Sequence, residues 1–216
     1  MKILIVDDHP VVRKGLRSIL EESEGIKVCG EAEEGNVALK IIKEQKPDLA
    51  IIDIQLKGNI NGIELVRAIK ERYPRVNTLV MSVDDGSLYA ERAIRAGARG
   101  YIAKEEAAGE ILKAIDAICR GKMYLSSDVS NFIAGKYIVG APSSPELAVA
   151  NLSDRELEIF QLIGRGYKRN EIAKKLNINV NTIESHRRKI REKLNLKDSA
   201  ELTKTAVEWH SSMSMQ

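Results

Sequence analysis

Five polar residues in the first half of the chain carry side chains that could act together in phosphate chemistry. Each follows a short apolar run, and the five are Asp7, Asp8, Asp53, Ser82 and Lys104. Clustered carboxylates repel one another and attract a hard divalent cation such as Mg²⁺. One carboxylate can accept a phosphoryl group while a lysine and a hydroxyl bind the phosphoryl oxygens. Any one of these residues could simply cap a helix or face solvent, so the chemistry depends on the fold bringing all five together.

The pattern between these residues predicts a sheet that would bring them together. Over residues 1–122, apolar runs typical of buried parallel strands alternate with amphipathic stretches typical of helices. The runs are Ile3–Val6, Ile26–Cys29, Leu49–Ile52, Thr78–Met81 and Tyr101–Ala103. This alternation predicts an α/β domain with a doubly wound, five-stranded parallel sheet of the flavodoxin-like kind. Sites in such sheets lie at the carboxyl ends of the strands, which is where the five polar residues stand.

These residues resemble the receiver domains of NarL/FixJ-type response regulators. The matching segments are Asp7-Asp8-His9-Pro10, Asp53, Ser82 and Gly100-Tyr101-Ile102-Ala103-Lys104. The resemblance implies that Asp8 and Asp53 bind Mg²⁺ together with the backbone carbonyl of Gln55, and that Asp7 assists. It also implies that Asp53 accepts a phosphoryl group from a sensor histidine kinase, and that Ser82 and Tyr101 relay the resulting change.

Two positions near the acceptor depart from the family's pattern. The family commonly has a proline four residues after the acceptor and a glycine eight residues after it. Here Lys57 holds the first position and Gly62 lies one residue later than usual, so we expect a longer loop after Asp53. Val83 stands where a small residue is usual, which would narrow access to the phosphoryl group. Both departures bear on the rates of phosphorylation and dephosphorylation rather than on the chemistry.

The basic charge of the chain lies in its last third. The formal net charge is only +3 at pH 7, but the segment His186–Lys193 contains five Lys or Arg residues and one acid. Such a run is typical of a surface that meets phosphates, although a solvated helix face gives the same pattern. The strand and helix alternation ends near residue 122, and the uncharged segment Gly140–Pro145 is typical of a linker. We therefore predict a receiver over 1–122, an amphipathic helix and linker over 123–151, and a second domain over 152–216.

The second domain is predicted to be a small all-α helix-turn-helix domain. Ser153 and Glu156 have the spacing of a capping box, and Asn179 can cap a later helix that a brief turn separates from the helix before it. At about 100° per residue, the later helix has a core-facing arc and an opposite outward face. The core residues are expected to be Ile183, Ile190 and Leu194, and the outward residues Asn181, Ser185 and Arg188.

Residues 152–207 resemble LuxR-type DNA-binding domains. The resemblance is carried by Leu152–Glu156, Glu171–Ala173, Thr182–Ile183, His186 and Lys193–Leu194. It implies base-edge contacts from Glu184, Ser185 and Arg188, and backbone contacts from Thr182, Arg187 and Lys189. Lys168 replaces a frequent serine before the second helix and could add a phosphate contact. The last helix, about Ser199–Val207, resembles a dimerisation element, so a homodimer is expected to read paired half-sites in double-stranded DNA, with RNA polymerase as a further candidate partner.

The apolar runs are far too short to cross a bilayer, and Met1 leads directly into one of them without the pattern of a signal peptide. We therefore expect a cytoplasmic protein without a membrane partner. The expected function is that of a two-component response regulator and transcription factor, not an enzyme. One alternative is a phosphorylation-independent DNA-binding regulator with a degenerate receiver, which the intact set of five residues disfavours. The other is an aspartyl-phosphate phosphatase-like enzyme, which would not need the helix-turn-helix pattern.

Overall fold

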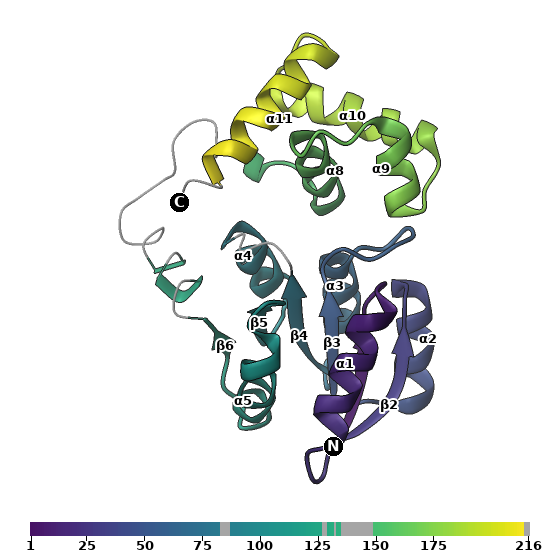
Figure 1. Cartoon of the computed structure of the whole chain (residues 1–216), viewed down its shortest axis with the longest axis vertical. Helices are drawn as coiled ribbons and strands as arrows, with labels where there is room; N and C mark the ends of the chain where they lie inside the picture. Colours follow the sequence, from purple (N-terminus) through teal and green to yellow (C-terminus); the bar gives the residue numbers. More distant parts are fainter. Residues whose placement is uncertain (83–86, 127–128, 132, 135–148, 214–216) are drawn as a thin grey trace. The chain divides into compact units, whose positions relative to one another are not determined.

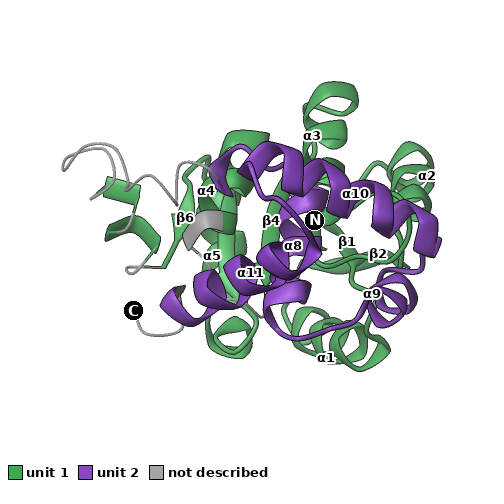
Figure 2. Cartoon of the chain, turned by 90° about the horizontal axis from the view of Figure 1, so that it is seen from above, with its two compact units in different colours: residues 1–135 green, residues 136–216 purple. Residues whose placement is uncertain are grey.

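The computed structural model describes residues 1–82, 87–126, 129–131, 133–134 and 149–213 (Figure 1). The chain divides into two compact units, residues 1–135 and 136–216, and each is described by itself (Figure 2). Among the described residues, no helix is both long and apolar enough to cross a membrane. Most of the predicted helix and linker over 123–151 lies outside the described residues, so the domain boundaries given above stay a prediction.

Unit 1 contains a parallel sheet in the strand order β2-β1-β3-β4-β5-β6. The strands are β1 (Lys2–Val6), β2 (Lys27–Ala32), β3 (Leu49–Asp53), β4 (Asn77–Ser82), β5 (Gly100–Ala103) and β6 (Tyr124–Leu125). The parallel α/β fold is confirmed, but the prediction of five strands was short by one. Gly121, at a φ of 75°, turns the chain after the helix Ala107–Cys119, and the Tyr124 amide then donates to the Arg99 carbonyl at 3.0 Å. The resulting strand has two residues, too few to leave a periodic signal in the sequence.

Helices cover both faces of the sheet, as Figures 1 and 2 show together. One face carries α1 (Pro10–Glu21) and α5 (Ala107–Cys119), and the other carries α2 (Gly35–Gln45), α3 (Gly62–Arg72) and α4 (Ser87–Ala96). Every residue of β3 is buried, as expected for a strand covered on both faces. The core under α1 and α5 is built from aliphatic side chains of the strands and of these two helices. This layer fixes the strands whose ends carry the polar residues.

The start of α3 holds the backbone at the end of β3. Asn61 caps the helix through a capping box with Glu64, and the Gly62 amide donates to the Ile54 carbonyl at 2.9 Å. A Cβ added to Gly62 would lie 2.1 Å from the Asp53 carbonyl oxygen, closer than real Cβ atoms approach. Only glycine therefore fits at this position, and the close contact fixes the peptide of the expected phosphoacceptor.

Unit 2 contains α8 (Asp154–Gly164), α9 (Arg169–Leu176), α10 (Val180–Leu194) and α11 (Ser199–Met213). The predicted capping box is present, since the Ser153 side chain accepts from the Glu156 amide and Glu156 accepts from the Ser153 amide. On α10, Ile183 and Ile190 are fully buried as predicted, whereas Leu194 is only half-buried. The brief turn between α9 and α10 gives the all-α helix-turn-helix arrangement that the sequence indicated.

Candidate functional site

The strand ends of unit 1 bring the five predicted polar residues to one edge of the sheet. Asp7 and Asp8 follow β1, Asp53 ends β3, Ser82 ends β4 and Lys104 follows β5. Because β1, β3, β4 and β5 are consecutive neighbours in the sheet, their carboxyl ends meet at the same edge. Residues that lie far apart in the sequence therefore form one cluster.

Lys104 joins two of the carboxylates. Its Nζ lies 2.7 Å from Asp7 Oδ2 and 2.7 Å from Asp53 Oδ2. Burial disfavours the charged lysine, but its interactions with Asp53 and Asp7 outweigh this effect and raise the pKa of Lys104. The ammonium group is therefore held in place, charged, beside the carboxylate that the sequence identified as the phosphoacceptor.

Asp53 is held at both carboxylate oxygens. Oδ2 accepts from Lys104, and Oδ1 accepts from the backbone amide of Gln55 at 3.2 Å. Burial raises the pKa of Asp53 to about 7, the nearby Lys104 opposes this rise, and Asp7 adds to it. The carboxylates of the cluster thus carry more negative charge than their surroundings readily tolerate. A divalent cation would favour the ionised form and reverse this shift.

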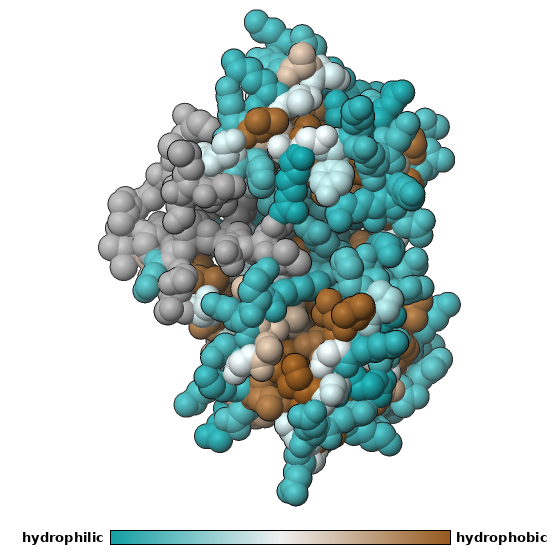
Figure 3. Space-filling model, in the orientation of Figure 1, coloured by the Kyte–Doolittle hydropathy of each residue, from teal (hydrophilic) through white to brown (hydrophobic). Residues whose placement is uncertain are grey.

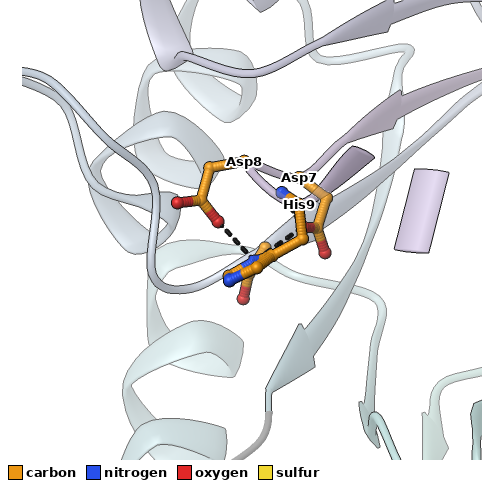
Figure 4. Close-up of side chains that lie close together, drawn as sticks. Asp7, Asp8 and His9 are labelled. Atoms are coloured by element: carbon orange, nitrogen blue, oxygen red, sulfur yellow. Dashed lines mark hydrogen bonds and ion pairs between the residues drawn. The ribbon is translucent and has the colours of Figure 1, made fainter. Parts of the chain in front are cut away.

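The carboxylates of Asp7, Asp8 and Asp53, together with the His9 ring, each offer a ligand atom, and these atoms lie within 4.8 Å of one another. His9 Nδ1 lies 2.6 Å from Asp8 Oδ1 and 3.3 Å from Asp7 Oδ1 (Figure 4). Among the described residues, the buried Asp8 Oδ1 has the His9 ring nitrogen as a close contact but accepts no hydrogen bond. A buried carboxylate oxygen that lacks a hydrogen bond suits a cation, so these oxygen donors fit Mg²⁺. The sequence reasoning assigned no role to His9, although the Asp7-Asp8-His9 run was its signal.

The loop after Asp53 brings a second cation to the cluster. Lys57 Nζ lies 3.5 Å from Asp8 Oδ2, and the lysine side chain remains 42% exposed. The position that departs from the family's pattern therefore faces a predicted metal ligand. The pairing was not predicted, because nothing in the sequence shows where this loop turns. Val83, the other departure, lies outside the described residues.

The two expected relay residues lie in the sheet next to the cluster. Ser82 and Tyr101 are each 1% exposed, and they stand on the neighbouring strands β4 and β5. A backbone hydrogen bond joins the ends of β4 and β5, because the Lys104 amide donates to the Ser82 carbonyl at 2.7 Å. A change at the end of β4 is therefore mechanically coupled to the position of Lys104.

Helix α10 presents most of the residues predicted to contact DNA. The exposed members of this set are Thr182, Glu184, Ser185, Arg188 and Lys189, while Arg187 is half-buried. Glu184 Oε1 lies 3.7 Å from Arg169 Nη1 and 3.9 Å from Arg187 Nε.

The turn before α9 presents the remaining member of the predicted set. Lys168 is exposed at the N-cap of α9, where its backbone amide donates to Glu171 at 2.7 Å while its own side chain makes no cap hydrogen bond. Glu171 thus satisfies the Lys168 backbone amide, and the Lys168 side chain is exposed.

Two family models match the chain. Residues 3–116 match the response regulator receiver domain, and residues 150–206 match the bacterial regulatory proteins of the luxR family. Together these matches mark a transcription regulator rather than a stand-alone enzyme.

Relatives match the chain over nearly its whole length. The chain is 36% identical over 207 residues to the response regulator UvrY of Escherichia coli, which covers 96% of this chain and 94% of that protein. It is 34% identical to the oxygen regulatory protein NreC of Staphylococcus haemolyticus, covering 96% and 97%. A structure of RcsB from Salmonella enterica, bound to a promoter in the presence of the phosphomimetic BeF3⁻, has a TM-score of 0.64 and 26% identity, covering 95% and 98%. The chain therefore belongs to the NarL/FixJ-type response regulators, in which a receiver domain is followed by a LuxR-type helix-turn-helix domain.

Proposed function

We propose that Asp53 accepts a phosphoryl group from a sensor histidine kinase, and that this event controls how two copies of the chain bind DNA in the cytoplasm. The observation that carries the proposal is the lysine bridge, in which Lys104 Nζ lies 2.7 Å from both Asp7 and Asp53. This bridge places a fixed positive charge where the phosphoryl oxygens would arrive. Such preorganised charge is the main contribution of a protein to phosphoryl transfer.

The transfer step requires little other chemistry. A carboxylate oxygen of Asp53 forms a bond to phosphorus as the bond from phosphorus to the donor histidine nitrogen breaks, and the electron pair of that bond stays on the nitrogen. Lys104 and the hydroxyl of Ser82 would then bind phosphoryl oxygens. Because the Lys104 amide donates a hydrogen bond to the Ser82 carbonyl, movement of either residue would shift the ends of both β4 and β5. Tyr101, buried on β5, is the proposed second residue of this relay.

The residues present fit a Mg²⁺ ion. Asp8, Asp53 and the Gln55 carbonyl would hold it, and Asp7 would assist. When bound, the ion supplies positive charge that lowers the repulsion between Asp53 and the incoming phosphoryl group. The buried Asp8 oxygen, which accepts no hydrogen bond from the described residues, and the raised pKa of Asp53 both support a cation at this position.

We propose that α10 enters the major groove of double-stranded DNA. Ser185 and Arg188 lie on its exposed face and would reach base edges, while Thr182, Lys189, Arg187 and Lys168 would contact the backbone. Glu184 is the remaining predicted base reader, but its carboxylate lies near two arginines of its own domain. The relatives support the DNA-binding role, since one RcsB structure is described as two dimers bound to two parallel DNAs, with 26% identity and a TM-score of 0.59.

The proposed homodimer needs a surface, and the receiver carries exposed apolar residues that suit one. Figure 3 shows hydrophobic residues at the surface of unit 1 over α1 and α5. Val11 on α1 is 82% exposed, Leu112 on α5 is 39% exposed, and Met123 after α5 is 49% exposed. Exposed apolar residues of this kind favour pairing with another protein surface. RNA polymerase remains a further candidate partner.

Mass spectrometry of the full chain after treatment with acetyl phosphate and Mg²⁺ tests the acceptor. We expect the wild type to gain the mass of one phosphoryl group and Asp53→Asn to gain none. An unchanged gain in Asp53→Asn would place the acceptor elsewhere. No gain in the wild type under conditions that modify a known receiver would instead favour the phosphorylation-independent alternative.

A further inference from the structure

A cavity of about 410 Å³ lies within unit 2, beside the recognition helix. It is lined by the end of α8, the turn before α9, the first residue of α9, one side of α10 and the beginning of α11. Its charged lining residues are Lys168, Arg169, Glu184 and Arg187. Among the described residues, three cations and one acid therefore face the same space, which gives it a net positive charge.

The one acid is shared by two of the cations. Glu184 Oε1 approaches both Arg169 Nη1 and Arg187 Nε, at 3.7 Å and 3.9 Å. Both distances exceed those of a hydrogen bond, so the carboxylate offsets part of the charge of the two arginines without saturating their N–H groups. Ion pairs of this length near solvent are weak and are readily exchanged for a better acceptor.

Arg187 has room for a further hydrogen-bond acceptor. Its side chain is 13% exposed, and its buried Nε atom has no hydrogen-bond partner in the part of the chain that the structure describes. Buried polar groups in native proteins are nearly always bonded, and an exception often marks the place of an ion or a ligand. A guanidinium group presents a fork of N–H donors that matches the oxygens of a phosphate better than it matches one distant carboxylate oxygen.

We propose that this cavity binds one backbone phosphate of DNA, and that Glu184 serves as an internal substitute for that phosphate in the free protein. The inference rests on the proposed function of α10 as the recognition helix. Two cavity residues of α10, Glu184 and Arg187, are the sequence neighbours of the proposed base readers Ser185 and Arg188. A duplex that lies on the exposed face of α10 would therefore bring its sugar-phosphate backbone to the cavity. Phosphate oxygens then take the donors of Arg187 and Arg169, and Glu184 is displaced.

The exchange of Glu184 for a DNA phosphate makes the affinity depend on how the duplex is placed. A duplex that does not seat a phosphate in the cavity meets two arginines whose charge is partly offset and a carboxylate that repels it. A correctly placed duplex gains both arginines. Glu184 therefore lowers the affinity for unspecific DNA, and its role is electrostatic positioning rather than base reading.

The test compares Glu184→Gln with Glu208→Gln in the full-length protein. Glu208 is exposed on α11 and its ion pair is with Lys204, so the control makes the same change in net charge away from the cavity. Binding of a random-sequence 20-base-pair duplex is measured over a series of salt concentrations. We expect Glu184→Gln to bind about three- to tenfold more tightly at low salt, with a salt slope steeper by about 0.9, the contribution of one phosphate. Glu208→Gln should change affinity less than twofold.

A second measurement separates the sources of phosphate. The Nε–Hε resonance of Arg187 in the full chain is followed by NMR during titration with the duplex and, separately, with inorganic phosphate. A shift with the duplex at stoichiometric concentration, and none with millimolar inorganic phosphate, supports the proposal. An equal response to free phosphate at low concentration would overturn the assignment to DNA.

The remaining outcomes distinguish the inference from the function on which it rests. If the wild type binds DNA and the two variants behave alike, the phosphate cavity is refuted while the DNA-binding function stands. If Glu184→Gln instead loses preference at one base pair without binding random DNA more tightly, Glu184 is a base reader and the inference is wrong. If the wild type binds no duplex at any salt concentration, the proposed function itself fails.

Discussion

Replacing Gly62 by alanine should disturb the phosphoacceptor without touching its side chain. The new Cβ would lie 2.1 Å from the Asp53 carbonyl oxygen and 2.7 Å from the Ile54 Cα, whereas real Cβ contacts stay beyond 3.0 Å. Both neighbours are backbone atoms that cannot rotate away, so β3 and α3 must separate by about 1 Å. Overpacking of this kind typically costs about 1–3 kcal/mol, and we expect the upper end of that range. A displacement of about 1 Å at a reacting group can also slow a reaction by about 100-fold.

Calorimetry and mass spectrometry of the full chain measure these two effects. The melting transition of the receiver should fall by roughly 5–15 °C in Gly62→Ala, and phosphorylation by acetyl phosphate should slow. Gly15→Ala is the control, because a Cβ at that helical position meets nothing within 4 Å. Alanine is favoured over glycine inside a helix, so Gly15→Ala should be neutral or slightly stabilising. If the two variants melt and react alike, the packing argument at the end of β3 is wrong.

Three further perturbations test other parts of the account. Lys57→Gln removes a cation 3.5 Å from Asp8 and should tighten Mg²⁺ binding about two- to fivefold in calorimetric titrations. The control, Lys40→Gln, changes an exposed lysine and should leave Mg²⁺ binding unchanged. Equal Mg²⁺ affinities of the two variants would contradict the pairing of Lys57 with Asp8. Lys193→Met removes the ammonium 2.7 Å from Glu156 and should destabilise unit 2 by about 1–2 kcal/mol at pH 7, followed by Trp209 fluorescence. Burial raises the pKa of Glu156, but Lys193 and Ser153 outweigh this effect and hold that pKa below its ordinary value. The ion pair therefore stabilises the fold fully above the ordinary pKa, and the effect of Lys193→Met should shrink as the pH falls through the lowered pKa. A loss of stability that does not depend on pH would argue against the ion pair. Arg188→Ala should cost about 1–3 kcal/mol at the preferred DNA sequence and relax specificity, while Lys189→Ala should weaken all sequences alike and lower the salt slope, and identical specificity profiles would refute this division.

The elements that place the receiver cluster could be predicted because their signals are local. Buried parallel strands leave continuous apolar runs, and the rule that sites lie at strand carboxyl ends then brings Asp7, Asp53 and Lys104 together without further information. The capping box at Ser153 and the buried face of α10 followed from spacing in the same way. The two-residue β6 could not be predicted, since its pairing with β5 depends on the turn at Gly121 rather than on a pattern of its own.

The contacts that the sequence did not reveal are between loops and between helices. Lys57 was noted only as a departure from a family pattern, and its approach to Asp8 depends on the path of the loop after β3. The resemblance to LuxR-type domains implied that Glu184 faces DNA, but it says nothing of Arg169, which lies close to Glu184 at the start of α9. The need for glycine at position 62 likewise follows from a contact with the Asp53 carbonyl. Such pairings depend on tertiary geometry, which residue spacing along one element does not determine.

The most direct test of the account is a binding titration of the full-length protein on DNA with one half-site and with two, before and after phosphorylation of Asp53. The half-site is first obtained by selection from random DNA. If the receiver acts by pairing two copies, phosphorylation should strengthen binding mainly at the paired sites, and Asp53→Asn should show no gain. Ser82→Ala should accept the phosphoryl group yet lose part of the gain. Equal strengthening on single and paired half-sites would contradict dimerisation as the coupling step.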